Sequence, residues 1–204
     1  MSYILAGCAA FVFLYIFDLN KIFGFHRFFN LFFGIGIVML GVATLGVSLR
    51  GEQDFFFPGA LHIFFWILAL GSFGLLLYAL FFALPFSKTY VELNKANQVI
   101  DSGMYALCRH PGVIWFFMMY MFLWLASGRW LVLLAGLIWT VMDVIHVYVQ
   151  DRWIFPKTLE GYDKYQQRTP FLIPNRSSLK KSMENYHWRH SGDTQRKIRT
   201  EKIR

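Results

Sequence analysis

Five long apolar runs constrain this chain more than any other feature of its sequence. They are separated by short polar stretches and cover residues 3–17, 31–49, 56–86, 112–126 and 130–149. A helix that crosses the hydrocarbon core of a bilayer needs about 20 mostly apolar residues, and tilt or interfacial aromatic anchors accommodate shorter runs. The pattern predicts an all-α, polytopic membrane protein with about five transmembrane helices.

The composition agrees with a chain that lies mostly in the bilayer. Hydrophobic residues make up 56% of the sequence and charged residues only 16%, whereas soluble domains carry about 25% charged residues. The charge is concentrated near the end, because 13 of the 20 Lys and Arg residues lie in residues 150–204. We therefore predict an integral membrane domain over residues 1–174 and a basic, disordered tail over 175–204. A basic tail beside a membrane is the simpler interpretation of this segment than a nucleic-acid arm, so we expect no nucleic-acid partner.

The links between the runs must alternate between the two sides of the membrane. Residues 18–30 read as a polar link, and Ser127-Gly128-Arg129 is so short that it joins the last two runs into an antiparallel hairpin. One side collects most of the basic residues: Lys21, Arg27, Lys88, Lys95, Arg109 and those of the tail. The other side has only Arg50 and Arg129. Because basic loops stay in the cytoplasm, we predict an outer N-terminus and a cytoplasmic tail, in the inner membrane if the cell is bacterial.

The first candidate site is Arg109-His110-Pro111, where a polar stretch meets the fourth run. Proline favours the first turn of a helix, and the free amides at such an end attract anions. Arg109 can bind a carboxylate or phosphate through two hydrogen bonds, and His110 can donate, accept or titrate near neutral pH. An Arg-His pair that only anchors the helix at the interface is an equally good interpretation.

The second candidate site lies at the end of the fifth run. Asp143, His146 and Gln150 are spaced i, i+3 and i+7, so they share one face of a helix. Asp143 lies inside the apolar run, where an ionisable group is costly and normally marks function. The alternative is an Asp143–His146 pair whose two members satisfy each other. Asp151 follows at the predicted cytoplasmic boundary.

Two motifs flank the predicted hairpin. The first is Val99-Ile-Asp-Ser-Gly-Met-Tyr-Ala-Leu-Cys-Arg-His-Pro111, with a small residue and Gly, then Tyr, then Arg-His-Pro opening a membrane helix. The second is Leu159-Glu-Gly-Tyr162-Asp-Lys-Tyr165-Gln-Gln-Arg168-Thr-Pro170-Phe-Leu-Ile-Pro174, which ends in an apolar-apolar-Pro pattern. In order and spacing the motifs resemble those of the isoprenylcysteine carboxyl methyltransferase and phospholipid methyltransferase superfamily. The resemblance covers about residues 95–174.

The resemblance implies a membrane methyltransferase that uses S-adenosylmethionine. The acceptor would be a lipid or prenyl-bearing molecule that enters laterally between helices, with the cofactor at the cytoplasmic side. By resemblance the catalytic residues are Arg109, His110 and Arg168. The cofactor-binding residues would be Gly103, Tyr105, Arg109, His110, Pro111, Gln150, Asp151, Tyr162 and Tyr165. No metal is required, and Cys8 and Cys108 form no CxxC motif that would hold one.

The chain departs from the family pattern at two places. Val113 and Trp115 stand where tyrosine and glycine are common, and Gln150-Asp151 replaces a pair of glutamates. Asp151 or Asp143 could supply the missing carboxylate, whereas Trp115 would narrow the space that glycine leaves. Two alternatives stay open: an NADPH-dependent reductase of the sterol reductase type, and a non-catalytic membrane protein on a degenerate methyltransferase scaffold.

Overall fold

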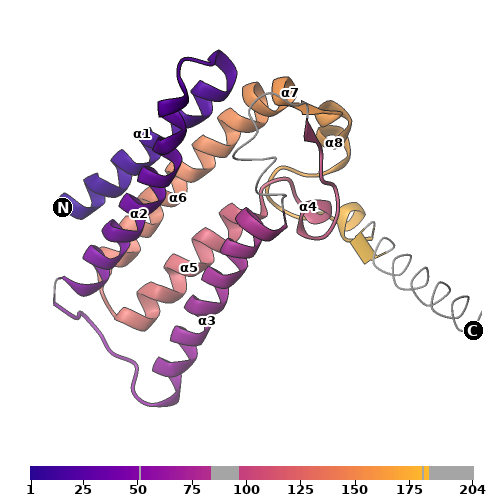
Figure 1. Ribbon diagram of the computed structural model, residues 1–204. Helices are drawn as coiled ribbons and strands as arrows, with labels where there is room; N and C mark the ends of the chain where they lie inside the picture. The colour runs from indigo at the N-terminus through magenta and orange to yellow at the C-terminus, as the bar shows by residue number, and fades with distance from the viewer. Residues whose placement is uncertain (51, 84–96, 181, 184–204) are drawn as a thin grey trace, which may run out of the picture.

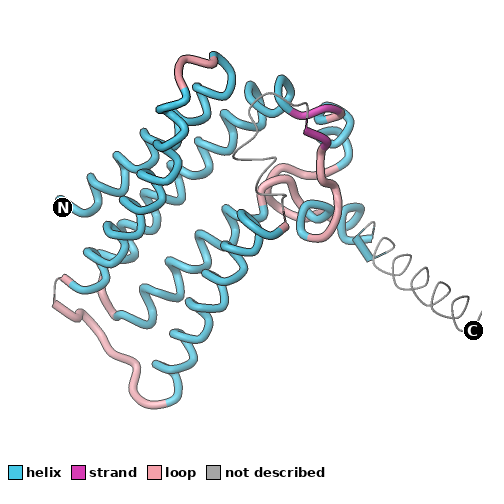
Figure 2. Tube along the Cα trace, viewed as in Figure 1, coloured by secondary structure: helices cyan, strands magenta, loops and turns pink. Residues whose placement is uncertain are grey.

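The computed structural model describes residues 1–50, 52–83, 97–180 and 182–183, and it is almost entirely helical (Figures 1 and 2). Its five long helices are α1 (Ser2–Phe23), α2 (Leu31–Leu49), α3 (Ala60–Leu77), α5 (Pro111–Ser127) and α6 (Trp130–Val149). Four helical segments of the described chain are long and apolar enough to cross a membrane: Ser2–Phe23, Arg27–Leu49, Ala60–Phe82 and Trp130–Thr158. The prediction of an all-α polytopic membrane protein is confirmed.

Shorter elements continue or connect the long helices. They are the 3-10 helix η1 (Arg27–Asn30), the π-helices η2 (Tyr78–Phe82) and η4 (Gln150–Ile154), and the short helices α4 (Met104–Leu107), α7 (Phe155–Thr158) and α8 (Tyr162–Arg168). Two short strands, β1 (Asn97–Gln98) and β2 (Leu159–Glu160), pair in parallel. The strand pair joins the stretch before α4 to the segment after α6, so the two predicted motifs meet at one end of the bundle (Figure 1).

The long helices form two groups that are joined through the hairpin of α5 and α6. Helix α1 packs on α2 and α6, whereas α3 packs on α5, and α2 and α3 diverge from each other (Figure 1). Helix α5 has 17 residues and is shorter than the other four. It lies between α3 and α6 and shares the buried core with them through Phe116 and Tyr120.

Small residues let α1, α5 and α6 approach closely around Trp139, which is fully buried. The Trp139 indole donates a hydrogen bond to the Ile4 carbonyl at 3.1 Å. A Cβ on Gly7 would lie 2.1 Å from the Trp139 ring, and a Cβ on Gly136 would lie 2.5 Å from Tyr120. Close approach of this kind is the main source of helix association in lipid, so these glycines fix how the helices pack.

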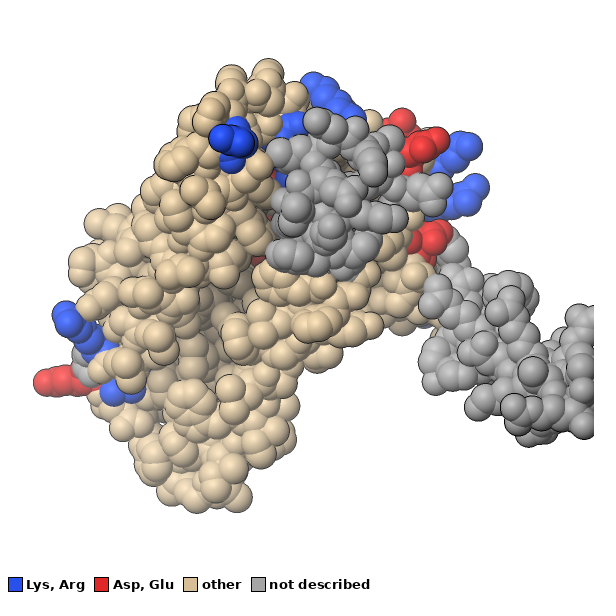
Figure 3. All heavy atoms as spheres, in the orientation of Figure 1, with Lys and Arg blue, Asp and Glu red and all other residues tan. Residues whose placement is uncertain are grey.

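Charged side chains gather at the two ends of the bundle, and the face between them is uncharged (Figure 3). At one end, the backbone amides of Asp54 and Phe55 donate to the Gly128 carbonyl at 2.8 and 3.2 Å. The Asp54 carboxylate in turn accepts from the Trp130 amide at 2.8 Å. The link before α3 and the turn of the hairpin therefore lie on the same side, as alternating spans require.

One prediction about the links is wrong. Residues 18–30 are not all a polar link, because α1 continues to Phe23 and buries Asp18 and Asn20 at 3% exposure each. The part of the tail that the structure describes is helical over residues 176–180, and the disorder of the tail stays a prediction. Its first turn is capped by the Asn175 side chain, which accepts from the Ser178 amide at 2.8 Å. Residues 181 and 184–204 of the tail, and Lys88 and Lys95, lie outside the described residues.

Candidate functional site

The backbone around Arg-His-Pro is held by the segment that follows α8. The Arg109 amide donates to the Pro170 carbonyl at 2.9 Å, and the His110 amide donates to the Phe171 carbonyl at 3.2 Å. His110 is the N-cap residue of α5 and Pro111 is its first residue, as predicted. These contacts hold the backbone of Arg109 and His110 against the segment that follows α8.

Asp151 is the centre on which the polar side chains converge. Arg109 Nη2 donates to Asp151 Oδ2 at 3.0 Å, and Arg109 Nε lies 2.9 Å from Oδ1. His110 Nε2 lies 3.1 Å from the same Oδ1. The Arg109 and Asp151 side chains are only 10% and 7% exposed. A carboxylate that accepts from a guanidinium inside the protein forms a strong, charge-assisted contact.

Helix α8 completes this group, which we call the Asp151 cluster: Arg109, His110, Asp151, Tyr162 and Gln166. The Tyr162 hydroxyl donates to Asp151 Oδ1, and Gln166 Nε2 donates to Oδ2 at 2.8 Å. The backbone carbonyl of Gln166 accepts from Arg109 Nη1 at 2.7 Å. The prediction did not include Gln166. Its position four residues after Tyr162, on the same face of α8, is the signal that could have identified it.

Two further tyrosines connect this cluster to the rest of the bundle. Tyr165 donates its hydroxyl proton to the Tyr105 carbonyl at 2.7 Å, and Tyr105 donates to the Ala79 carbonyl of η2 at 3.0 Å. Gly103 acts through its backbone: its φ of 62° and ψ of −130° suit only glycine. The predicted residues Gly103, Tyr105 and Tyr165 therefore position the segment before α5 against η2 and α8.

Burial sets the protonation states around Asp151. It lowers the pKa of His110, although the hydrogen bond from His110 to Asp151 opposes this effect. Burial and the hydrogen bond to Asp151 both raise the pKa of the Tyr162 phenol. A neutral His110 with its proton on Nε2 and a protonated Tyr162 therefore both donate to Asp151.

A second group, the Asp18 cluster, consists of Asp18, His146 and Gln150. Asp18 Oδ2 lies 2.7 Å from His146 Nε2 and accepts from Gln150 Nε2 at 2.6 Å. Gln150 therefore contacts Asp18, whereas the next residue, Asp151, contacts Arg109 and His110. The alternative of a self-satisfying Asp143–His146 pair is wrong, because the partner of His146 is 128 residues away on α1. The signal that could have identified Asp18 is its position as an acidic residue at the end of the first apolar run.

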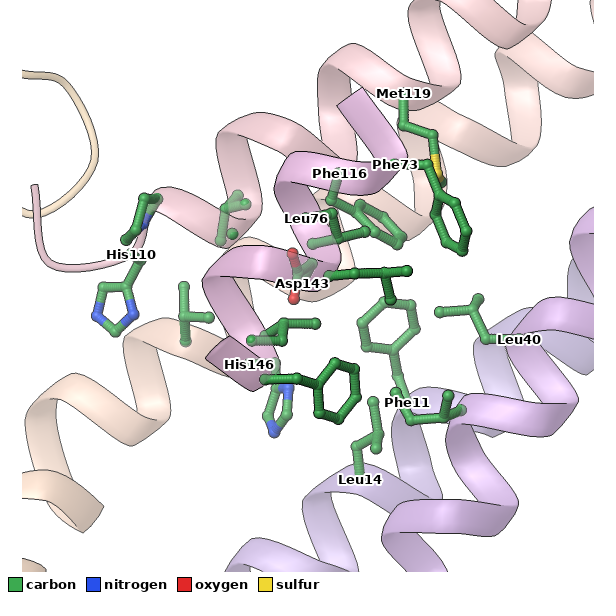
Figure 4. Close-up of a pocket in the computed structure, with 18 of the residues that line it drawn as sticks. Phe11, Leu14, Leu40, Phe73, Leu76, His110, Phe116, Met119, Asp143 and His146 are labelled. Atoms are coloured by element: carbon green, nitrogen blue, oxygen red, sulfur yellow. The ribbon is translucent and has the colours of Figure 1, made fainter. Parts of the chain in front are cut away.

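Asp143 differs from the other acidic residues of this region. In the part of the chain that the structure describes, its carboxylate takes part in no hydrogen bond or ion pair. It lines a cavity and lies among apolar side chains such as Leu76 and Phe116 (Figure 4). Asp143 therefore borders the cavity and also interacts electrostatically with His146 one turn away.

Arg168, for which the resemblance implies a catalytic role, lies outside the Asp151 cluster. Its side chain is exposed on α8 and borders a small outer pocket together with Asp101 and Lys164. Among the described contacts, it makes no hydrogen bond or ion pair with the Asp151 cluster. The helix places Tyr162, Tyr165 and Gln166 inward, which leaves the position of Arg168 facing outward.

A cavity of about 1510 Å³ connects both clusters with the interior of the bundle. Its polar end is lined by Arg109, His110, Asp18, His146 and Gln150. The remainder is lined mostly by apolar side chains of α1, α2, α3, α5 and α6, together with Asp143 and, toward the other end of the bundle, Ser127 and Arg129. Leu45 and Leu70 line it and yet are 61% and 64% exposed. The cavity is therefore open to the outside between α2 and α3, where a membrane would supply lipid.

The two departures at the start of α5 have different outcomes. Val113 is buried and lines the cavity. Trp115 is half-buried and packs against the hydrophobic core, and it is not among the side chains that line this cavity. The expectation that Trp115 narrows the ligand space is wrong, because its position on α5 points away from the cavity.

The resemblance implies S-adenosylmethionine as the cofactor, and its charged groups can be compared with the residues of the cavity. The cofactor carries a carboxylate, an ammonium and a sulfonium. Arg109 carries a positive charge that attracts a carboxylate, and its three nitrogens already contact Asp151 and the Gln166 backbone carbonyl. The acidic residues can attract the ammonium. Tyr105, Tyr162 and Tyr165 line the cavity, and aromatic faces stabilise cations such as the sulfonium.

Comparisons with protein-family models, with curated proteins and with solved structures find no match to this chain. Its function is therefore inferred from its own residues.

Proposed function

We propose that this protein transfers a methyl group from S-adenosylmethionine to a lipid or prenyl-bearing acceptor at the cytoplasmic face of the membrane. One observation carries the proposal: Arg109, His110 and Tyr162 converge on Asp151 at the polar end of a cavity whose remaining lining is mostly apolar and which opens between α2 and α3. A polar end suits a charged cofactor, and an apolar remainder suits a hydrocarbon chain.

The size of the cavity supports two ligands at once. Pockets for single small ligands usually have volumes of about 300–1,000 Å³, and this cavity has about 1510 Å³. The lateral opening beside Leu45 and Leu70 would admit the acceptor from the bilayer without passage through water. The motifs that resemble the methyltransferase superfamily supply the polar end.

The residues of this chain would act mainly by binding and orientation. Bound S-adenosylmethionine would supply an electrophilic methyl group. Arg109 and the acidic residues would hold the amino-acid part of the cofactor, and the tyrosines would face the sulfonium. Alignment of two bound reactants supplies much of the rate of a transfer reaction, and the enclosed cavity would keep water from competing.

The distribution of charge supports the cytoplasmic assignment. Within the described chain, the end that carries the Asp151 cluster also carries Lys21, Arg27, Arg109, Arg152, Lys157, Lys164 and Arg168. The opposite end carries Arg50 and Arg129, with Glu52 and Asp54 beside Arg50. The more basic end would face the cytoplasm by the positive-inside rule.

Titration calorimetry of the full chain in detergent tests the proposal. The wild-type protein is expected to bind S-adenosylmethionine and not NADPH. Arg109→Ala and His110→Ala are each expected to weaken this binding at least tenfold, because both side chains line the polar end. Arg152→Ala is the matched control, since Arg152 is exposed next to Asp151. Wild-type affinity in both variants would refute the site, and binding of NADPH instead would indicate the reductase.

A further inference from the structure

The Asp18 cluster has features that the binding of a cofactor does not explain. Asp18 and His146 are 3% and 7% exposed. His146 lies within the apolar run of α6, and Asp18 directly follows the apolar run of α1. Ionisable groups at such positions are costly and usually serve a function. Asp143, one turn before His146, makes no hydrogen bond or ion pair within the described part of the chain, which a pair that only joins two helices does not explain.

The hydrogen bonds around Asp18 fix the state of His146. Asp18 Oδ2 accepts from Gln150 Nε2 at 2.6 Å and lies 2.7 Å from His146 Nε2. A carboxylate oxygen that accepts both bonds places the imidazole proton of His146 on Nε2. Nδ1 then carries a lone pair, and in the described part of the chain no hydrogen bond occupies it. His146 lines the cavity, so this lone pair belongs to a side chain that a ligand can reach.

Asp143 lies one helical turn before His146 and lines the same cavity (Figure 4). An acidic group that lacks a partner among apolar side chains is unfavourable unless a ligand donates to it. Asp143, His146 and Asp18 can all accept hydrogen bonds, so together they match a head group that donates them. A carboxylate head group would instead meet like charges.

The Asp18 cluster is also close to the Asp151 cluster. Gln150 contacts Asp18 and the next residue, Asp151, contacts Arg109 and His110, so one peptide unit separates the two clusters. Consecutive Cα atoms are about 3.8 Å apart. A head group beside His146 would therefore lie near the place proposed for the cofactor.

We propose that His146, held by Asp18, accepts the proton of the methyl acceptor, and that Asp143 binds the same head group, which is an amine or a hydroxyl. This inference rests on the proposed function. In the step, the neutral nitrogen or oxygen of the acceptor bonds to the methyl carbon as the carbon–sulfur bond breaks with its electron pair on sulfur. His146 Nδ1 takes the proton of that nitrogen or oxygen, Asp18 stabilises the imidazolium, and water later removes the proton. A carboxylate acceptor has no proton to lose and would not need this base.

Other titratable groups face His146 and contribute to any pH dependence. From α1 these are Tyr15, whose ring lies 4.7 Å from that of His146, and Lys21, which interacts electrostatically with Asp18. His110 interacts with His146 electrostatically from the start of α5. A pH profile is therefore interpreted only as the difference between wild type and His146→Gln.

Binding of three compounds that share the same farnesyl tail and differ in their head group tests the head-group site without turnover. Farnesylamine, farnesol and farnesoic acid carry an amine, a hydroxyl and a carboxylate. The full chain in nanodiscs, without cofactor, is expected to bind the first two at least tenfold more tightly than the third, and Asp143→Asn is expected to remove most of this preference. Asp163→Asn is the control, because Asp163 is exposed on α8. Equal binding of the three compounds, or an Asp143→Leu variant with raised thermal stability and unchanged binding of farnesylamine, would overturn the site.

Transfer of radiolabel from S-adenosylmethionine to farnesylamine and farnesol tests the proton acceptor. His146→Gln is expected to lower the rate about 10²–10⁴-fold, as removal of a general base does, with unchanged binding of S-adenosylmethionine. Asp18→Asn is expected to lower the rate as well, and His62→Gln, which changes a histidine away from the cavity, is not.

The outcomes separate the two proposals. A wild-type protein that does not bind S-adenosylmethionine refutes the proposed function and this inference with it. A protein that binds the cofactor and transfers label, with equal rates and pH profiles in wild type, His146→Gln and Asp18→Asn, refutes only the proton acceptor. Label found on farnesoic acid but not on the amine or the alcohol refutes the assigned head group.

Discussion

The Asp151 cluster makes a quantitative prediction about stability. Asp151→Asn keeps the size of the side chain but removes the negative charge that Arg109 and His110 contact at 2.9–3.1 Å. The Arg109 side chain is 10% exposed, so water compensates little for the loss. Asparagine also replaces one of the two carboxylate oxygens with an NH₂ group. This NH₂ group would face N–H and O–H groups that donate to Asp151 in the wild-type protein.

The expected cost follows from the burial of this pair. Removing one partner of a buried ion pair destabilises by about 3–5 kcal/mol, and the remaining carbonyl oxygen of asparagine places this variant at the lower end, about 3 kcal/mol. For a chain of about 200 residues each kcal/mol lowers the thermal midpoint by about 2–4 °C. We therefore expect a midpoint lower by about 6–12 °C. We also expect faster hydrogen exchange in α8, because one of the two oxygens that accept from Tyr162 and Gln166 is lost.

Unfolding in mixed detergent micelles, followed by tryptophan fluorescence, measures the free energy of unfolding. Asp163→Asn on the exposed face of α8 is the matched control, with an expected change within about 0.5 kcal/mol. A loss of less than about 1 kcal/mol in Asp151→Asn, or an equal loss in the control, would show that Asp151 does not hold α8 to α5 by its charge.

Two further predictions use the same measurement. Gly103→Ala should cost about 1–3 kcal/mol, because its φ of 62° and ψ of −130° exclude a side chain, whereas Gly112→Ala in α5, where a Cβ would have room, should not destabilise. For His110, burial lowers the folded-state pKa below the ordinary 6.5. The contribution of neutral His110 to the free energy of unfolding is therefore present above pH 6.5 and is lost as the pH falls through the lower folded pKa. The free energy of unfolding should fall between pH 7 and pH 5, and His110→Gln should show a smaller fall. An unchanged slope in that variant, or a Gly103→Ala midpoint equal to wild type, would contradict these arguments.

Local patterns in the sequence determine the helices and the way the polar motifs begin and end them. The lengths of the apolar runs predict the membrane helices, and three residues between the last two runs require a hairpin. Pro111 marks the first residue of α5 because its missing N–H costs nothing there. The spacing of Tyr162 and Tyr165 places both inward from α8. Each of these results depends on residues that are neighbours along the chain.

Only the tertiary structure decided which side chains meet. His146 pairs with Asp18, 128 residues away, and not with Asp143 on its own helix. Gln150 and Asp151 are consecutive and yet belong to different clusters, and Arg168 faces outward although it belongs to the same motif as Tyr162. These outcomes depend on the rotation of each helix about its axis and on its depth against its neighbours. Helical periodicity shows which residues share a face of a helix, but it does not show which other helix that face will contact. The packing of α6 against its neighbours leaves Asp143 facing the cavity.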